Sequence, residues 1–391
     1  MIKYTVQSGD TLYRLSKGFG CSIDDICRTN SISASQILRE GQKLSIPVQA
    51  GGVILSDCPN STNTTRACGC SFFETEVSAS RLVFYSERPR VVYLARDDVF
   101  GEAVAASALQ HFPVDGPLLL TDPNRLPEIV AAEIRRLNPT GAPSSAQVVV
   151  VGNVGEGVLA DVRGLGFSVE RLLGFNMFET AALVAQRRGY PENIQLVSTN
   201  PASGGAVAAS WSAHTGDPTL LTENNLLPEA TRQAILNTKN PKVYVIGGRQ
   251  FISDQVIEEL RRLNVTFVDR IVGADPYETA VLFARYKSPV SSYGWNRNKK
   301  EGQAFSFPLF EQWQYLASST PLSHMGKHTP FLFVNRNSVP PVVTKYIKEV
   351  NPRSVDRPPF MHGFLIGSPC LISEDVQATL EAALSIDMQH M

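Results

Sequence analysis

Phe73-Glu74-Thr75 is an aromatic residue followed by Glu-Thr, and the same motif returns as Phe178-Glu179-Thr180 and as Tyr277-Glu278-Thr279. The copies start 105 and 99 residues apart, a spacing typical of one small domain. Other features recur in a fixed order around each copy: a strand-like segment that starts with proline (117–121, 218–222, 330–334), a further proline (Pro127, Pro228, Pro340), an Asn-Pro pair (138–139, 240–241, 351–352) and an apolar run ending in glycine (148–152, 243–247, 364–367). This order predicts a three-fold internal repeat.

The second copy shows the expected secondary structure most clearly. Apolar strands at 194–197, 219–222, 243–246 and 268–272 alternate with helices at 178–186 and from 204, 228 and 253 onwards. Such alternation predicts parallel strand pairing in a Rossmann-like α/β sandwich. The first copy matches well. The third carries an aromatic-rich insertion that ends at 324–328, and its first strand is hard to find.

Composition narrows the class of protein. The 391 residues carry a net charge of −1, whereas a nucleic-acid-binding domain is normally strongly basic. No apolar run approaches the length of a membrane span, and residues 1–10 lack the layout of a signal peptide. We therefore expect no nucleic-acid partner and no membrane span, and either the protein is not exported through a signal peptide or the sequence is that of a mature form.

The N-terminal 48 residues form a separate small module. Tyr4-Thr5-Val6 and Lys43 to Pro47 alternate as strands, and two short helices are expected between them. This stretch resembles a LysM domain, in 4–12, 26–30 and 38–47. The resemblance implies binding of N-acetylglucosamine glycans, such as peptidoglycan or chitin, in a groove between two loops. The implied contact residues are Gly9, Asp10, Thr11, Leu12, Asn30, Ile32, Leu38 and Gly41; Asp10 and Asn30 could instead only cap and close turns.

The three copies resemble the type 2 cell wall binding repeat of Gram-positive surface proteins. The strongest match is 270–280, together with 218–222 and 243–248. The resemblance implies three tandem repeats in a pseudo-three-fold unit that binds anionic secondary wall polymers. We expect a LysM module at 1–48, a cysteine-containing linker at 49–71 and repeats at 72–174, 175–273 and 274–391. Where the family usually has Arg before the aromatic residue, this chain has Phe72, Met177 and Pro276. Where the family usually has Asp-Ala, this chain has Glu102-Ala103, Gly205-Ala206 and Gln303-Ala304.

The linker carries three of the six cysteines, Cys58, Cys68 and Cys70. The sequence contains no Cys-x2-Cys pair of the kind that binds zinc. We therefore expect disulfides, within or between chains, for this trio. Connectivity cannot be read from sequence. Free buried thiols suit Cys21, Cys27 and Cys370. The polar stretch 61–65 predicts an exposed connection.

Glycine turns before helices are candidate anion sites, because the first amides of a helix lack backbone partners. The candidates for polymer binding are Gly101, Gly204, Gly205, Gly247, Gly248 and Arg249, with Arg96 and Arg125 as further cations. Each could equally be a turn glycine or a solvated arginine. His324 and His328 lie four residues apart, but Gly326 and the lack of an acidic third ligand argue against a metal site. The Glu-Thr motif is expected to start a helix or to pair with a neighbouring arginine.

No nucleophile elbow, His-Glu-x-x-His motif or dinucleotide fingerprint appears. We expect no cofactor and no catalysis. The hypothesis is a bacterial envelope protein of the cell wall or spore surface that holds peptidoglycan-type glycan through its first module. The alternative is a self-assembling subunit of a spore coat or surface filament, cross-linked by disulfides. A peptidoglycan hydrolase ranks third.

Overall fold

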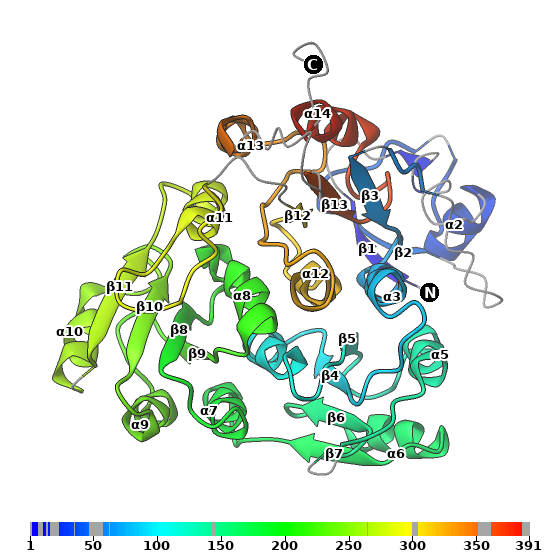
Figure 1. Ribbon diagram of the computed structural model, residues 1–391. Coiled ribbons are helices and arrows are strands. Elements are labelled where there is room, and N and C mark those ends of the chain that lie inside the picture. The colour runs from blue at the N-terminus through cyan, green and yellow to red at the C-terminus, as the bar shows by residue number, and fades with distance from the viewer. Residues whose placement is uncertain are drawn as a thin grey trace.

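The computed structural model describes residues 2–6, 11–12, 15, 23–34, 36–46, 58–61, 63–142, 145–263, 265–298, 304–350 and 361–384. Figure 1 shows a small N-terminal module beside a larger body of three sheets with helices around and between them. The mixed α/β class and the parallel sheets of the larger body confirm the predicted fold class.

The N-terminal module is built on a two-stranded antiparallel sheet. Strand β1 (Ile2–Thr5) pairs with β2 (Lys43–Ile46), with Tyr4 opposite Leu44, and helix α2 (Ile23–Asn30) packs on them. Leu12 and Leu15 are buried, and the amide of Leu15 donates to the Thr11 carbonyl as in a helical turn. This small core agrees with the predicted βααβ order where the structure describes it.

Repeats 1 and 2 share one element order. Repeat 1 runs α3 (Phe72–Val83), β4 (Val92–Arg96), α4 (Phe100–Ala106), η1 (Ser107–Gln110), β5 (Leu118–Thr121), α5 (Glu128–Leu137), β6 (Val148–Val151), α6 (Glu156–Gly164) and β7 (Val169–Leu172). Repeat 2 runs α7 (Met177–Arg187), β8 (Asn193–Ser198), η2 (Pro201–Ser203), η3 (Gly205–Val207), α8 (Ala208–Thr215), β9 (Thr219–Thr222), α9 (Glu229–Asn237), β10 (Lys242–Ile246), α10 (Asp254–Arg262) and β11 (Phe267–Ile271). Their sheets have the parallel orders β5-β4-β6-β7 and β9-β8-β10-β11.

Repeat 3 keeps the order but not all of its strands. It runs α11 (Pro276–Arg285), β12 (Ala304–Phe307), α12 (Tyr315–His324), α13 (Pro341–Val350), β13 (His362–Ile366) and α14 (Glu374–Leu384). The segment at 330–334 forms no named strand; it meets β12 and the residues just after it through the isolated bridges Ser306 with Phe331 and Leu309 with Val334. The first strand of repeat 3, which is hard to find in the sequence, is β12.

The last strand of the third sheet comes from the start of the repeat region. Strand β3 (Thr64–Ala67) pairs in parallel with β13, with Leu365 opposite Arg66, and takes the place that β7 and β11 hold in the other sheets. The expectation of an exposed connection at 61–65 is therefore wrong in its second half, because Thr64 is buried and Thr65 is half-buried in β3. Repeats 1 and 3 are joined into a ring through one shared sheet.

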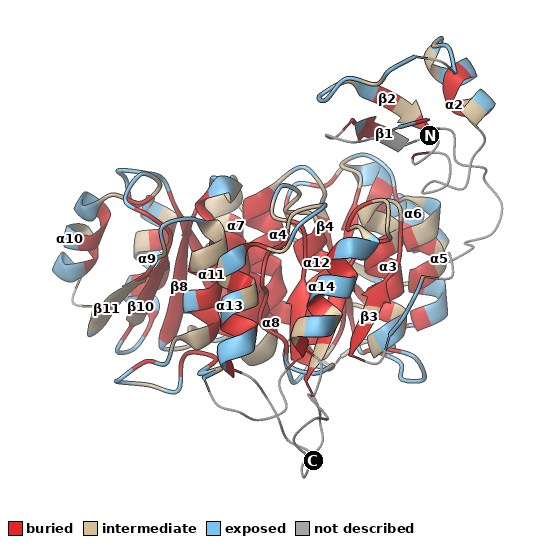
Figure 2. Ribbon diagram, turned by 90° about the horizontal axis from the view of Figure 1, so that it is seen from above, coloured by how far each residue is buried: buried red, intermediate tan, exposed pale blue. Residues whose placement is uncertain are grey.

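Helices of small residues fill the centre of the ring. Helix α12 contacts both α8 and α3, and α8 contacts η1. Every residue of α4 and of α12 is buried, and alanine and serine keep these side chains short enough for close approach. Figure 2 shows the buried residues running through the repeat region, with exposed faces on outer helices such as α10 and α14.

The Glu-Thr motif caps the first helix of each repeat. The N-cap of each helix lies two positions before the motif's aromatic residue, and its side chain accepts a hydrogen bond from the amide of the motif's glutamate. The N-caps are Ser71, Asn176 and Asp275, at 3.2, 2.9 and 2.8 Å. Each glutamate carboxylate reaches back to an amide just before the helix, those of Cys70, Phe175 and Ala274. This reciprocal arrangement is that of a capping box, with the carboxylate bonded to the amide one residue before the N-cap. The motif recurs because it starts a helix three times, as expected.

Candidate ligand-binding surfaces

The residues expected to bind glycan in the N-terminal module are only partly described. Gly9 and Asp10 lie outside the described residues. Thr11 is exposed and Leu12 is buried, while Ile32 and Leu38 pack on the module's core. Gly41 has a φ of +81° and donates its amide to the Val6 carbonyl, so it closes the turn before β2.

Asn30 holds the module together. Its side-chain amide donates to the carbonyls of Ile26 and Ser45 at 2.8 and 2.6 Å, and its oxygen accepts from the Ser45 amide at 2.6 Å. These bonds tie the end of α2 to β2, which is the turn-closing role. Ile37, in the segment between α2 and β2, was not among the expected contacts and is 86% exposed. It lies between Gln36 and the half-buried Leu38, and an exposed branched apolar residue of this kind can contact a sugar methyl group.

The glycines expected at open anion sites are packing positions. Gly101 is buried in α4, and a Cβ there would meet Leu221 Cδ1 at 2.6 Å and Met177 Sδ at 3.0 Å. Gly204 lies against Pro276, and Gly205 lies against Val197. Gly101 and Gly204 thus lie against residues of a neighbouring repeat, and Gly205 lies against its own repeat, so the space around these turns is filled; polymer binding at them stays a prediction.

The turn after β10 is closed in a similar way. Gly247 and Gly248 are buried, and the Gly248 carbonyl accepts hydrogen bonds from the amides of Phe251 and Ile252. Arg249 is exposed but pairs with Asp254 at 2.9 Å. Arg96 is likewise paired with Asp98 at 2.7 Å. Neither arginine is therefore a free cation beside an open backbone amide.

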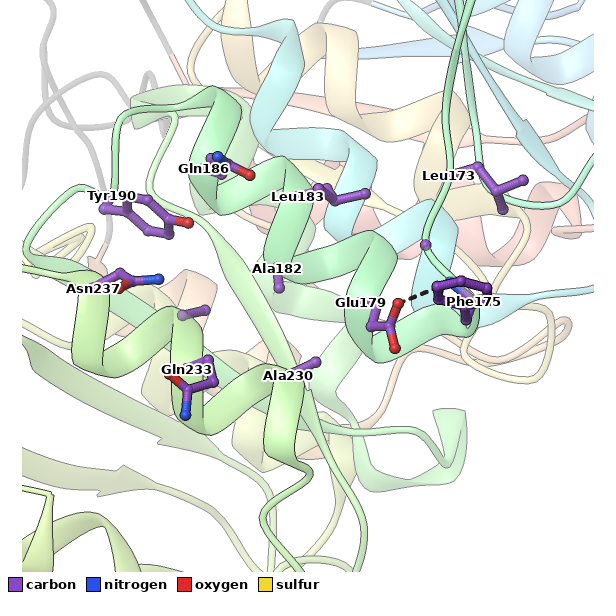
Figure 3. A pocket seen from close by; sticks show the side chains of 12 residues that line it. Leu173, Phe175, Glu179, Ala182, Leu183, Gln186, Tyr190, Ala230, Gln233 and Asn237 are labelled. Atoms are coloured by element: carbon purple, nitrogen blue, oxygen red, sulfur yellow. Dashed lines mark hydrogen bonds between the residues drawn. The ribbon is translucent and has the colours of Figure 1, made fainter.

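A groove with a volume of about 480 Å³ lies between α7 and α9 on the outside of repeat 2. Phe175 stands at one end and Tyr190 and Asn237 at the other, with Ala182 and Ala230 between them (Figure 3). The Phe175 side chain is 99% exposed. The groove thus has an aromatic ring at each end and alanines between them.

The same place is filled in the other two repeats. In repeat 1, Arg81 bonds the buried carboxylate of Glu133 at 3.3 Å. In repeat 3, Arg285 pairs with Glu349 and lies over the Tyr346 ring, 4.6 Å from its centroid.

Repeat 2 lacks both halves of this bridge. The residue seven positions after the motif's glutamate is Arg81, Gln186 or Arg285, and the residue six after the recurring proline is Glu133, Ala234 or Tyr346. Gln186 and Ala234 both line the groove. The groove is open in repeat 2 because a glutamine and an alanine replace the bridge.

The lining of the groove suits a neutral polar ligand. It offers the amide side chains of Gln186, Gln233 and Asn237, and no lysine or arginine. Its one carboxylate, Glu179, accepts from the Phe175 amide at 3.0 Å. Aromatic faces beside amide donors and acceptors match the apolar and hydroxyl faces of a sugar ring.

Four histidines gather where the central helices end, but not around a metal. His324 Nε2 bonds Asp115 at 2.7 Å, whereas His328 Nδ1 faces His214 Nδ1 at 3.1 Å. Burial lowers the pKa of His111 to about 4 and that of His214 to about 3. The described residues contain no group of three or more ligands placed to hold a metal ion. No helix among them is both long and apolar enough to cross a membrane.

The linker cysteines find partners within the chain. Cys58 and Cys68 form a disulfide, and Cys70 lies beside Cys370 with 3.7 Å between the sulfurs. Cys27 is a buried free thiol, as expected, and Cys21 lies outside the described residues. Disulfides within or between chains were expected for the trio, and Cys58 and Cys68 form one within the chain. Cys370 is a free thiol, as expected, but it is half-buried rather than buried.

Two family models match the chain: LysM domain at residues 4–47 and cell wall binding domain 2 (CWB2) at residues 171–257. The chain contains a LysM domain and a CWB2 domain. The LysM match spans the N-terminal module, and the CWB2 match spans most of repeat 2, including the groove between α7 and α9.

The chain is also similar to several named proteins. The chain is 25% identical over 356 residues to the amidase enhancer of Bacillus subtilis (strain 168), covering 90% of this chain and 45% of that protein. It is 23% identical over 218 residues to N-acetylmuramoyl-L-alanine amidase LytC of the same organism, covering 55% and 41%. Cwp6 from Clostridium difficile superposes with a TM-score of 0.68 at 19% identity, covering 83% of this chain and 48% of that one. The likeness to Cwp6 shows the fold, and this chain spans about half the length of the curated relatives it matches.

Proposed function

We propose that this chain is a non-catalytic envelope protein that attaches to the cell wall through two kinds of module. The LysM domain binds an N-acetylglucosamine glycan such as peptidoglycan. The three repeats, of which the second carries the CWB2 match, hold a second wall polymer or scaffold the wall. The observation that carries the proposal is the presence of LysM and CWB2 domains in one chain.

The contact with the second polymer is proposed for the groove between α7 and α9. The turn glycines are covered and the nearby Arg249 and Arg96 are paired, so they offer little to an anionic polymer. The groove instead presents Phe175, Tyr190 and amide side chains. We assign it to the uncharged sugar units of a wall polymer, whose phosphate or carboxylate groups would remain in solvent.

The relatives' names favour a place in the wall and leave the chemistry with other proteins. One relative is an amidase enhancer and another is an amidase, and we propose that this chain shares with them wall attachment rather than hydrolysis. The location is the cell wall or the spore surface. A wall-clearing assay that gave lysis with the pure protein would contradict the non-catalytic part of the proposal.

The second candidate is a self-assembling coat or filament subunit. It required cross-links between chains through the linker cysteines, whereas Cys58, Cys68 and Cys70 each face a cysteine of the same chain. The two candidates separate on non-reducing electrophoresis. A ladder of multimers that collapses with thiol supports assembly, and a monomer band supports attachment.

Co-sedimentation with walls tests the proposed function. Full-length protein is mixed with intact Gram-positive walls and with peptidoglycan stripped of secondary polymers. We expect Ile37→Asp to lower binding to stripped peptidoglycan about tenfold, because the charge would enter a sugar contact. We expect Gln186→Arg with Ala234→Glu, which rebuilds the bridge of Arg81 and Glu133, to lower binding to intact walls only. If the unaltered protein stays in the supernatant with both materials, the proposal is wrong.

A further inference from the structure

Cys70 and Cys370 are 300 positions apart in sequence, yet their sulfur atoms are 3.7 Å apart. We propose that these two residues form a reversible disulfide that covalently closes the ring of three repeats. Cys70 follows β3, the strand that completes the sheet of repeat 3, and Cys370 follows β13, its partner. The bond would join the two ends of the repeat region at the seam between them.

The backbone around the two cysteines is held in register on both sides. The amide of Gly367 donates to the Ala67 carbonyl at 3.0 Å, and the amide of Ser368 donates to the Gly69 carbonyl at 3.1 Å. Cys70 is fixed in turn by its amide, which donates to the Glu74 carboxylate at 2.6 Å. A disulfide needs only a small approach of two sulfurs that these bonds already place side by side.

The two thiols have different surroundings, which sets the order of events. Ser368 Oγ lies 2.7 Å from Cys370 Sγ, and the hydrogen bond with Cys70 together with that of Ser368 and the charge of Arg336 lowers the pKa of Cys370. The hydrogen bond with Cys370 and burial raise the pKa of Cys70. Because Ser368 Oγ lies within hydrogen-bonding distance of Cys370 Sγ, we take Cys370 as the thiol that attacks first, since the thiolate is the nucleophile.

The exchange needs an oxidant, which we take to be a small-molecule disulfide. The Cys370 thiol loses its proton to solvent, and its thiolate attacks one sulfur of the oxidant, forming a mixed disulfide and releasing one small thiolate. The Cys70 thiol then loses its proton and attacks the Cys370 sulfur, releasing the second small thiolate. The protein gives up two electrons and two protons, and the oxidant becomes two small thiols.

Closure at this seam differs from the bond already present. Cys58 and Cys68 are 10 positions apart, so their disulfide closes only a short loop that contains β3. The bond between Cys70 and Cys370 would span all three repeats, and constraint of the unfolded chain grows with the length of the closed loop. It would matter most outside the cell, where disulfides persist.

The full chain, with Cys58–Cys68 intact, is incubated with hydroxyethyl disulfide and then alkylated. Before alkylation we expect an intact-mass loss of about 2 Da, from two thiol hydrogens, and a rise in Tm of roughly 5–10 °C. Non-reducing peptide maps should link the peptides that hold residues 70 and 370. Cys70→Ser and Cys370→Ser should each abolish both changes.

A matched control excludes other pairings. In the Cys58→Ser/Cys68→Ser variant the link between residues 70 and 370 should still form, because its partners are untouched. Alkylation of both Cys70 and Cys370 after oxidation would overturn the proposal. So would a map that joins Cys70 to Cys58, to Cys68 or to a second chain.

Discussion

Replacement of the buried Arg66 should open the ring of repeats at its seam. Arg66 is 3% exposed, and its guanidinium donates to Gln377 Oε1 at 2.7 Å and to the carbonyls of Gly367 and Ser373 at 2.9 and 3.1 Å. Burial lowers the pKa of Arg66 to about 10, so the side chain stays charged at neutral pH. In Arg66→Met the volume is nearly kept while three acceptors lose their donor.

The magnitude follows from those three acceptors. Each buried acceptor without a partner costs about 1–3 kcal/mol. Replacing Arg66 also removes the free-energy cost of burying its charge, and this offsets part of the loss. We therefore expect a net loss of about 3–5 kcal/mol in the free energy of unfolding, which is a fall in Tm of roughly 6–15 °C for a chain of this size. The loss should be largest where β3 meets β13.

Hydrogen exchange measured by mass spectrometry locates the effect. The amides of β3 and β13 should exchange faster in Arg66→Met, while those of β8 and β10 should not change. The matched control is Arg270→Met, since Arg270 makes the equivalent bonds in repeat 2, to the carbonyls of Gly247 and Ile252 at 2.9 and 2.8 Å. That variant should loosen β10 and β11 and leave the seam protected. Unchanged exchange at β3 in Arg66→Met would refute the idea that Arg66 holds the seam.

Three further predictions concern stability. The pKa values of His111 and His214, about 4 and about 3, lie below the unfolded value, so the stability that these two neutral side chains contribute is present above pH 6.5 and is lost as pH falls. Between pH 7.5 and 5, urea unfolding should show a loss of about 1–2 kcal/mol for each histidine. A pH profile unaltered in His214→Phe would contradict this. Burial raises the pKa of Glu76, whose carboxylate accepts from the Leu120 amide at 3.0 Å, so its contribution is present at low pH and lost as pH rises; Glu76→Gln should stabilise the protein more at pH 8 than at pH 5 in the same assay. Gly101→Ala should lower stability by about 1–3 kcal/mol through overpacking, whereas an anion site there would cost polymer binding and leave Tm unchanged.

The sequence predicted the repeated α/β units well because their signals are local. The Glu-Thr motif is visible because a capping box needs Glu three residues after the N-cap. The strands are visible because a parallel sheet buries both faces. Neither signal depends on which part of the chain lies next to which.

The closing strand was missed because its signal is short and mostly polar. Arg66-Ala67-Cys68-Gly69 has the spacing of Arg171 to Gly174 and of Arg270 to Gly273. The arginine bonds the loop after the neighbouring strand, and the glycine packs on the capping box. A search for Arg-x-x-Gly before each Glu-Thr motif would have found β3 among the threonines of the expected linker.

The groove between α7 and α9 could not be predicted from the sequence, for a different reason. The groove exists because Gln186 and Ala234, on two helices, both differ from their counterparts in the other repeats. Either difference alone is an ordinary surface substitution. Only the packing of α7 against α9 shows that together they leave a space instead of the bridge of Arg81 and Glu133.

The shared sheet also changes where the repeat region begins. If β3 completes repeat 3, residue 72 is not a physical boundary, because a chain cut there would leave β13 with an unpaired edge and the Gly367, Ser373 and Gln377 acceptors without Arg66. Exposed edges of this kind promote association between chains. Self-assembly of a fragment that starts at residue 72 would therefore report the missing strand rather than a property of the whole protein, and only chains that keep β3 can decide between wall attachment and assembly.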